Sequence, residues 1–296
     1  MLNLFLRRPR GGNPQCLLAL VLLFAFASSP GLFAQTQLPQ NPNDLLRSAV
    51  QNELKHQNDA QLYSFRQRTE KPKETTVKQM VELPDGVVGR IILINDKPLT
   101  PQQERNEDSR VNRLLDPQQW RDKVKEQKED EQRTTRMVQA LPDAFIYTYA
   151  QTPKSGSLVT LSFKPNPNFD PPSRETLVFQ GMEGTVVVDT AAMRLAKVDG
   201  TMMRDVNIGW GILGHLDRGG HFYVEQAPVD GDHWDMVKMK LDFTGKALIF
   251  KTIRIKQTQT LSDFHRVEKM KMPEAIAYLK KTATSVENAA NASVHQ

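Results

Sequence analysis

The feature of this sequence that most constrains its fold is a series of short alternating segments between Phe145 and Lys256. Apolar and polar residues alternate along each segment, as from Val237 to Phe243, and turn signals such as Asp230-Gly231-Asp232 separate the segments. Because successive side chains of a β-strand point to opposite faces, this periodicity predicts strands. Turns at roughly 8–12-residue spacing then favour an antiparallel sheet or an open barrel.

The residues before this region predict a helix and a three-stranded meander. From Asp44 onward, apolar residues recur at helical spacing. Strand-like alternation then runs from Tyr63 to Ile94, and Lys71-Pro72-Lys73 and Pro84-Asp85-Gly86 provide two turns. We therefore expect one helix followed by three antiparallel strands.

The segment 101–140 differs in kind and predicts two helices inserted between strands. Thr100-Pro101 and Asp116-Pro117 each place a capping residue before a proline at the first helical position, with a glutamine at the third. Each cap satisfies backbone N–H groups that lack a partner within the helix.

The second of these helices has a strongly polar middle. No apolar residue occurs between Lys125 and Arg136, which predicts a solvated helix stabilised by ion pairs of Glu129 with Lys125 and Arg133. A charged stretch of this kind is either an exposed face or a docking surface for a partner.

Residues 1–34 have the pattern of a cleavable signal peptide. Arg7, Arg8 and Arg10 precede an unbroken apolar run from Cys16 to Ala27, which is short for a membrane span. The alternative is an uncleaved N-terminal anchor. Residues 35–43 are polar, contain proline, and are expected to form a linker.

Signal cleavage should leave a mature chain that begins near Gln35 and is found in the periplasm or outside the cell. The mass of the intact protein from the cell envelope tests this prediction. A full-length chain in the membrane pellet would contradict it and favour the uncleaved anchor.

Cleavage would also change the cysteine content and the net charge of the chain, and both restrict the functions that it can have. The single cysteine, Cys16, would be lost, so the mature chain could form no disulfide, thiol nucleophile or thiolate metal site. Three of the 39 basic residues and none of the 34 acidic ones would leave with it, so the formal net charge would fall from +5 to +2. This weak charge argues against nucleic acid as a partner.

No group of residues predicts catalysis, a metal site or a cofactor. Asp189-Thr190 follows three valines, as in aspartic proteases, but the next residue is alanine and the chain has no second copy, which favours a plain turn. The spacings among His215, His221 and His233 match no metal-binding pattern. The glycines of the 209–214 segment precede no helix pattern and therefore do not predict a nucleotide site.

Two strand-like runs carry a family resemblance. Gly184–Asp189 and Arg194–Gly200, joined by a short turn, resemble the strand-turn-strand of periplasmic lipoprotein-carrier (LolA-like) proteins. The likeness extends loosely through the Trp210 region to Asp242-Phe243 and Lys246. This resemblance implies a strongly bent antiparallel half-barrel whose apolar concave face is closed by helices. It also implies binding of acyl chains or other apolar groups without catalysis.

The sequence thus predicts an α+β fold: a bent antiparallel sheet or open half-barrel, mainly β, covered by helices. One domain should span residues 44–272 and contain the helical insertion 101–140. A C-terminal helix from Pro273 to about Val286, with a polar tail to residue 296, should follow.

The function predicted is non-enzymatic binding of a lipid or acyl chain on the concave face of the sheet. Alternating residues supply the candidate ligand-binding set, although the same residues would equally suit an ordinary core: Tyr147, Tyr149, Val186, Val188, Trp210, Val237, Met239, Leu241 and Phe243. The alternatives are an envelope protein-interaction or stress-sensing module that docks through the charged helix, and a hydrolase without a recognisable motif. No transmembrane span is expected after cleavage.

Overall fold

The computed structural model describes residues 38–56, 61–150, 156–208, 214–247 and 251–294. The predicted signal peptide, part of the linker and Trp210 lie outside these residues. The helices, including two 3₁₀ segments, are α1 (Pro42–His56), α2 (Pro101–Asn112), η1 (Arg113–Leu115), α3 (Pro117–Ala144), η2 (Glu175–Gly181) and α4 (Met272–Val294). The strands are β1 (Leu62–Lys71), β2 (Glu74–Leu83), β3 (Gly86–Ile94), β4 (Lys97–Pro98), β5 (Phe145–Tyr149), β6 (Leu158–Pro165), β7 (Met182–Asp189), β8 (Arg194–Met202), β9 (Val206–Ile208), β10 (Gly214–Leu216), β11 (His221–Asp230), β12 (His233–Ala247) and β13 (Lys251–Val267).

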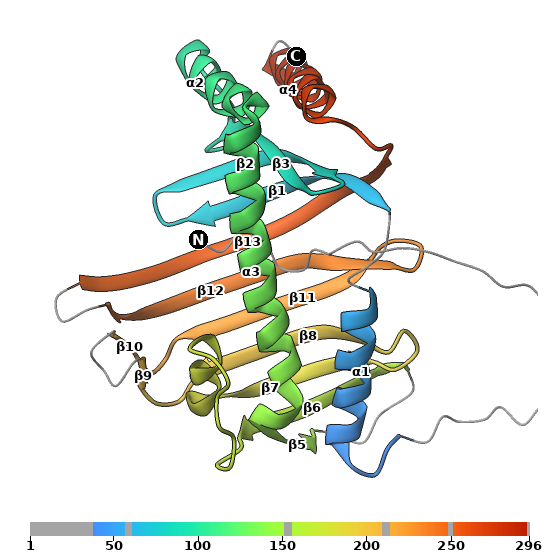
Figure 1. Cartoon of the computed structure of the whole chain (residues 1–296), viewed down its shortest axis with the longest axis vertical. Coiled ribbons are helices and arrows are strands. Elements are labelled where there is room, and N and C mark those ends of the chain that lie inside the picture. The colour runs from blue at the N-terminus through green and yellow to red at the C-terminus, as the bar shows by residue number, and fades with distance from the viewer. Residues whose placement is uncertain (1–37, 57–60, 151–155, 209–213, 248–250, 295–296) are drawn as a thin grey trace, which may run out of the picture.

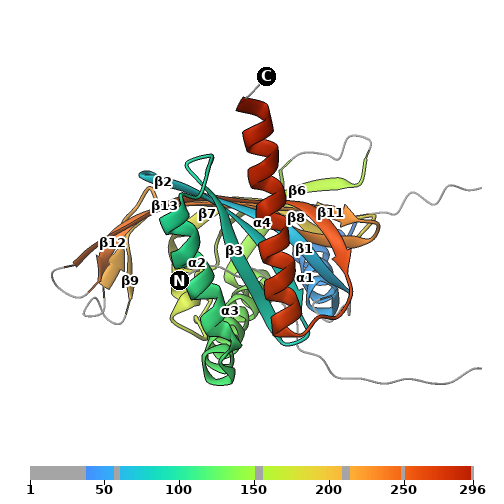
Figure 2. The ribbon, with the colours of Figure 1, turned by 90° about the horizontal axis from the view of Figure 1, so that it is seen from above.

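These strands form one open antiparallel sheet, which confirms the predicted fold class. Its order is β4-β3-β2-β1-β13-β12-β11-β8-β7-β6-β5, and the small β9–β10 hairpin attaches to β12. The sheet is curved, and α1, α2 and α3 lie on its concave side (Figures 1 and 2). Helix α3 crosses the strands from the meander at one end of the sheet to β5 at the other (Figure 1).

The meander of β1, β2 and β3 forms as predicted and buries both of its faces. Met80 and Val87 point to the concave side of the sheet, whereas their neighbours Val81 and Val88 pack against Leu279 of α4 on the opposite side. Helix α4 continues to Val294, so the polar tail predicted after Val286 is largely helical.

The convex face of the central strands is polar. The His221 imidazole on β11 donates a hydrogen bond to the Asp199 carboxylate on β8 at 2.8 Å, and the Lys256 ammonium on β13 lies 3.2 Å from the Asp242 carboxylate on β12. The central strands therefore have one polar, solvated face and one apolar face, which is the usual arrangement in antiparallel sheets.

Both predicted helix caps are present. The Thr100 side chain accepts a hydrogen bond from the backbone of Gln103, whose side chain accepts one from the Thr100 backbone, which completes a capping box. Asp116 accepts hydrogen bonds from the backbone N–H groups of Gln118 and Gln119 at 2.8 and 3.0 Å. The helices extend to Ala144, four residues beyond the predicted insertion.

Asp116→Ala should lower the free energy of unfolding by about 1 kcal/mol, because two N–H groups at the start of α3 lose their acceptor. Urea denaturation measures the change, and Asp116→Asn, which keeps an acceptor oxygen, is the matched control. An unchanged midpoint in Asp116→Ala would show that this end of α3 does not contribute to the cooperative fold.

Candidate binding site on the concave face

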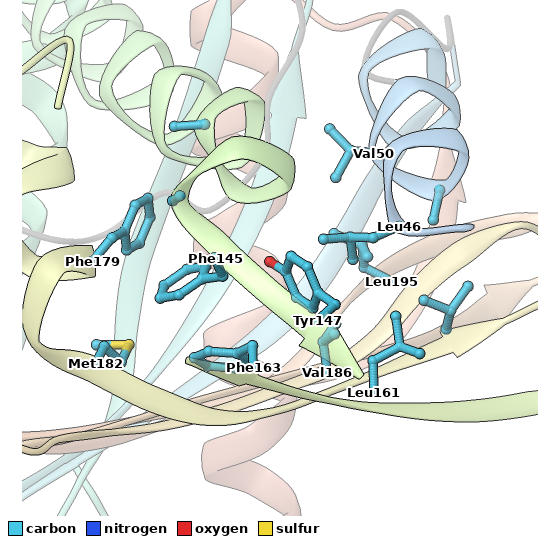
Figure 3. Packing of buried hydrophobic residues seen from close by; sticks show 14 of the residues in the cluster. Leu46, Val50, Phe145, Tyr147, Leu161, Phe163, Phe179, Met182, Val186 and Leu195 are labelled. Atoms are coloured by element: carbon cyan, nitrogen blue, oxygen red, sulfur yellow. The ribbon is translucent and has the colours of Figure 1, made fainter. Parts of the chain in front are cut away.

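The concave face of the sheet carries two apolar clusters, which differ in how they are covered. The first lies over β5–β8 and includes side chains from α1, from η2 and from the end of α3 (Figure 3). The second lies over β1–β3 and β11–β13, and each of its members belongs to a strand: Tyr63, Phe65, Met80, Val87, Val224, Met236, Met239, Leu241 and Leu261. The partly buried residues packed against it are Phe222, Phe243 and Phe264, which also lie on strands.

The first cluster is a conventional core in which helices and strands interlock. The Phe145 ring centroid lies 4.5 Å from that of Phe163 and 5.2 Å from that of Phe179 (Figure 3). The Tyr147 hydroxyl donates to the carbonyl of Leu141 at 2.9 Å, and burial raises the pKa of this phenol well above its ordinary value. These contacts fill the space between the sheet and its covering helices.

A buried ion pair joins α1 to the first cluster. Arg194 at the start of β8 donates from Nε to Glu53 of α1 at 2.7 Å and from a terminal nitrogen at 2.9 Å. The side chains are only 7% and 2% exposed. No sequence pattern indicates this pairing, because the two residues are 141 positions apart.

The predicted ligand-binding residues divide between the two clusters. Tyr147, Val186 and Val188 are buried in the first, and Tyr149 packs against it, with its hydroxyl donating to the Pro39 carbonyl at 2.6 Å. These four residues therefore belong to the core that also includes side chains of α1, α3 and η2.

The rest of the predicted set belongs to β12, apart from Trp210, which lies outside the described residues. Met239 and Leu241 are in the second cluster, and Phe243 packs against both clusters. Val237 is not in either cluster, because the register between β11 and β12 shifts after Glu225 and leaves Val237 as the extra residue of a bulge in β12. Met236 takes the inward position instead, at 2% exposed.

The middle of α3 is not the fully solvated helix that the sequence predicts. Gln127 and Thr134, within the stretch that lacks apolar residues, are each 8% exposed. The Thr134 hydroxyl bonds back to the Asp130 carbonyl of its own helix at 3.1 Å. The predicted ion pairs are also wrong: Arg133 pairs with Asp130 instead of Glu129, and Lys125 has no ion pair with Glu129 among the described contacts.

Two hydrogen bonds to the backbone of β3 explain why the polar Gln127 side chain is buried. Its amide donates to the Val87 carbonyl at 2.8 Å and accepts from the Val87 N–H at 3.0 Å, as a neighbouring strand would. A Cβ at Gly86 would lie 2.6 Å from the Gln127 oxygen, so glycine allows this close approach. The end of β3 is thus capped by a side chain from α3.

Helix α2 completes the same edge of the sheet. Glu107 accepts from the Ile91 N–H at 2.6 Å, and Arg110 donates to the Gly89 carbonyl at 2.6 Å and to both Glu107 oxygens at 2.7 Å. Burial raises the pKa of the Glu107 carboxyl, but the hydrogen bonds from Arg110 and Ile91 outweigh it, and the pKa lies below its ordinary value.

This arrangement predicts a loss of stability in acid. Because the pKa of Glu107 is lower in the folded protein, its contribution is complete above the ordinary pKa of about 4.3 and is lost as the pH falls through the folded value. The difference in urea midpoint between the parent and Glu107→Gln should therefore shrink as the pH is lowered below about 4. A difference that is the same at pH 7 and pH 3 would contradict the prediction.

The polar residues that the sequence offered as catalytic or metal-binding candidates do not lie together in one site. Asp189 accepts hydrogen bonds from the backbone N–H groups of Ala191 and Ala192, as expected of a turn aspartate. His215 pairs with Asp217, whereas His233 stacks on Tyr63 with ring centroids 4.3 Å apart. Within the described part of the chain, no three histidine, aspartate or glutamate side chains are grouped closely enough to hold a metal ion.

A charged groove of about 510 Å³ lies on the other flank of α3, near the β2–β3 turn. Two residues that line this groove are hydrogen-bonded to each other: the Trp120 indole N–H donates to the Asp85 carboxylate at 2.8 Å. The other lining residues come from α3: Arg121, Val124, Lys125, Lys128, Glu129 and Gln132. The charged composition of this helix is evident from the sequence. The groove is not, because it also depends on Asp85 in the β2–β3 turn, which lies in a different part of the chain.

No protein-family model, curated protein or solved structure matches this chain. In the part of the chain that the structure describes, none of the helices is both long enough and apolar enough to cross a membrane.

Proposed function

We propose that this protein binds the hydrocarbon chain of an amphiphilic ligand against the second cluster, beneath α3, and that it catalyses no reaction. The observation that carries this proposal is the contrast between the two surfaces that meet there. The strands present buried apolar side chains such as Met80, Met239 and Leu241, whereas no α3 side chain belongs to the second cluster.

An ordinary helix-on-sheet core buries an apolar stripe of the helix against the sheet. The first cluster follows this rule, with Met137, Val138 and Leu141 of α3 packed against it. Between Val124, which lies near Gly86, and Met137, the buried positions of α3 are polar, at Gln127 and Thr134. A hydrocarbon chain would supply the missing apolar layer, and each buried CH₂ group would contribute roughly 0.8 kcal/mol.

The shape of the molecule supports the same function. Helix α3 packs mainly against β3 and η1 near its start and against α1, β5 and η2 near its end. Between these supports it crosses the concave side of the curved sheet (Figures 1 and 2). A helix held at both ends can admit a ligand beneath its middle while the elements that support it stay in place.

Mass spectrometry of organic extracts from the natively purified protein tests the proposal and identifies the ligand class. A stoichiometric lipid or fatty acid is the expected result, and addition of the recovered compound should raise the melting temperature of the delipidated protein. Protein that contains no extractable amphiphile and binds no neutral apolar probe would contradict the proposal.

A second candidate function is docking of an acidic partner protein in the charged groove. The supporting observation is that Lys125 and Lys128 line this groove and form no salt bridge with the described residues. Lys125→Glu with Lys128→Glu should abolish such a complex and leave binding of an apolar probe unchanged, which separates the two functions.

A further inference from the structure

Two half-buried lysines lie where the second cluster meets α2 and α3. Lys78 of β2 is two residues from Met80 and points to the same, concave face of the sheet. Its cross-strand partners are Gln67 on β1 and Ile91 on β3. Lys78 therefore borders the apolar cluster on the surface that would hold the ligand.

Lys123 approaches the same place from α3. It precedes Gln127 by one helical turn and therefore lies on the side of α3 that meets the edge of β3. Arg110 and Glu107 of α2 bind that edge at Gly89 and Ile91.

The charges of these groups interact. Burial lowers the pKa of Lys78, the charges of Arg110 and Lys123 lower it further, and Glu107 raises it. Burial also lowers the pKa of Lys123, with an opposing effect from Glu126 and a further lowering by Arg110. Arg110 is thus close enough to both lysines to lower their pKa values, and Lys123 is close enough to lower the pKa of Lys78.

The positive charges exceed the negative charges in this cluster. Arg110 and Glu107 bind each other through two hydrogen bonds of 2.7 Å and so neutralise each other. Neither Lys78 nor Lys123 forms a hydrogen bond or salt bridge with another described residue. Partly desolvated ammonium groups without such partners favour the approach of an anion.

We propose that Lys78 and Lys123 bind the anionic group of the amphiphile whose hydrocarbon chain lies on the second cluster. This inference rests on the proposed function and specifies its ligand: a single-chain or branched amphiphile whose head carries a carboxylate or a phosphate. Both groups offer the oxygen acceptors that an ammonium group binds in charge-assisted hydrogen bonds.

Displacement of a bound neutral probe, N-phenyl-1-naphthylamine, by ligands of equal chain length tests the inference. Palmitate carries a carboxylate, palmitoyl lysophosphatidate carries a phosphate, and methyl palmitate carries no charge. At least one of the two anions should displace the probe at a concentration about tenfold lower than methyl palmitate does. The stronger of the two identifies the head group.

Lys78→Met and Lys123→Met should each weaken displacement by the preferred anion about tenfold and leave displacement by methyl palmitate unchanged. Methionine keeps an unbranched apolar stem, so packing is largely retained. Lys125→Met, two residues from Lys123 and therefore on the outer flank of α3, is the matched control and should change neither value.

Two results would overturn the inference. Equal displacement by methyl palmitate and both anions in the parent protein would exclude an anion site while the proposed function stands, and this comparison needs no variant. Equal losses in Lys125→Met and in the two test variants would show a general effect of charge. Failure of the parent to bind the neutral probe would refute the proposed function itself, and this inference with it.

Discussion

Arg194→Met is expected to lower the free energy of unfolding by about 3–5 kcal/mol, the largest stability effect that we predict. The change leaves the Glu53 carboxylate, 2% exposed, without the two hydrogen bonds that compensate its burial. The Arg194 guanidinium also lies 5.9 Å from the Trp234 ring centroid, so one side chain connects α1, β8 and β12. Urea denaturation at neutral pH measures the loss.

Two controls separate burial from charge in this result. Glu53→Leu combined with Arg194→Met removes both charges and should recover most of the loss, because no unpaired ion remains in the core. Arg47→Met breaks an ion pair with Asp143 whose side chains are 47% and 63% exposed, and should cost within about 1 kcal/mol. Equal effects of Arg194→Met and Arg47→Met would contradict the account of the buried pair.

Met239→Trp should abolish binding of a neutral apolar probe with little change in stability. Met239 of the second cluster is 1% exposed and lies opposite Val224 on β11 and Gln259 on β13. A larger side chain at this point would fill the layer that we assign to the ligand, because α3 contributes no apolar residue there. Probe titration and thermal denaturation of the same sample measure both quantities.

Met202→Trp is the matched control for this prediction. Met202 is also 1% exposed but belongs to the first cluster, which covering helices already fill. Overpacking there should cost about 1–3 kcal/mol and leave probe affinity per folded molecule unchanged. If Met239→Trp behaved like Met202→Trp, the second cluster would be an ordinary core and the binding proposal would fail.

Local patterns predicted much of this fold because they reflect local physics. The alternation from Tyr63 to Ile94 and the caps at Thr100 and Asp116 depend on neighbouring residues, and the corresponding elements form where they were expected. The pairing of β1 with β13 depends on contacts between distant parts of the chain, for which a single sequence offers no periodic signal.

The errors have physical reasons of the same kind. Alternation placed Val237 on the inward face, but a bulge that no local pattern indicates gives that position to Met236. The polar composition of α3 predicted full solvation, whereas Gln127 is buried because the edge of β3 needs a hydrogen-bonding partner. Lys78 and Lys123 are on different elements, so no local pattern could assign them to one site.

Photolabelling with a palmitic acid analogue that carries a diazirine in its chain tests the central claim most directly. After irradiation and digestion, labelled peptides should come from β11 and β12, which carry Val224, Met239 and Leu241, and from β2, which carries Met80. Excess palmitate should suppress this labelling. Labelling confined to α1 or β5–β7, or spread over the convex face and insensitive to palmitate, would contradict the claim that an apolar chain binds beneath α3.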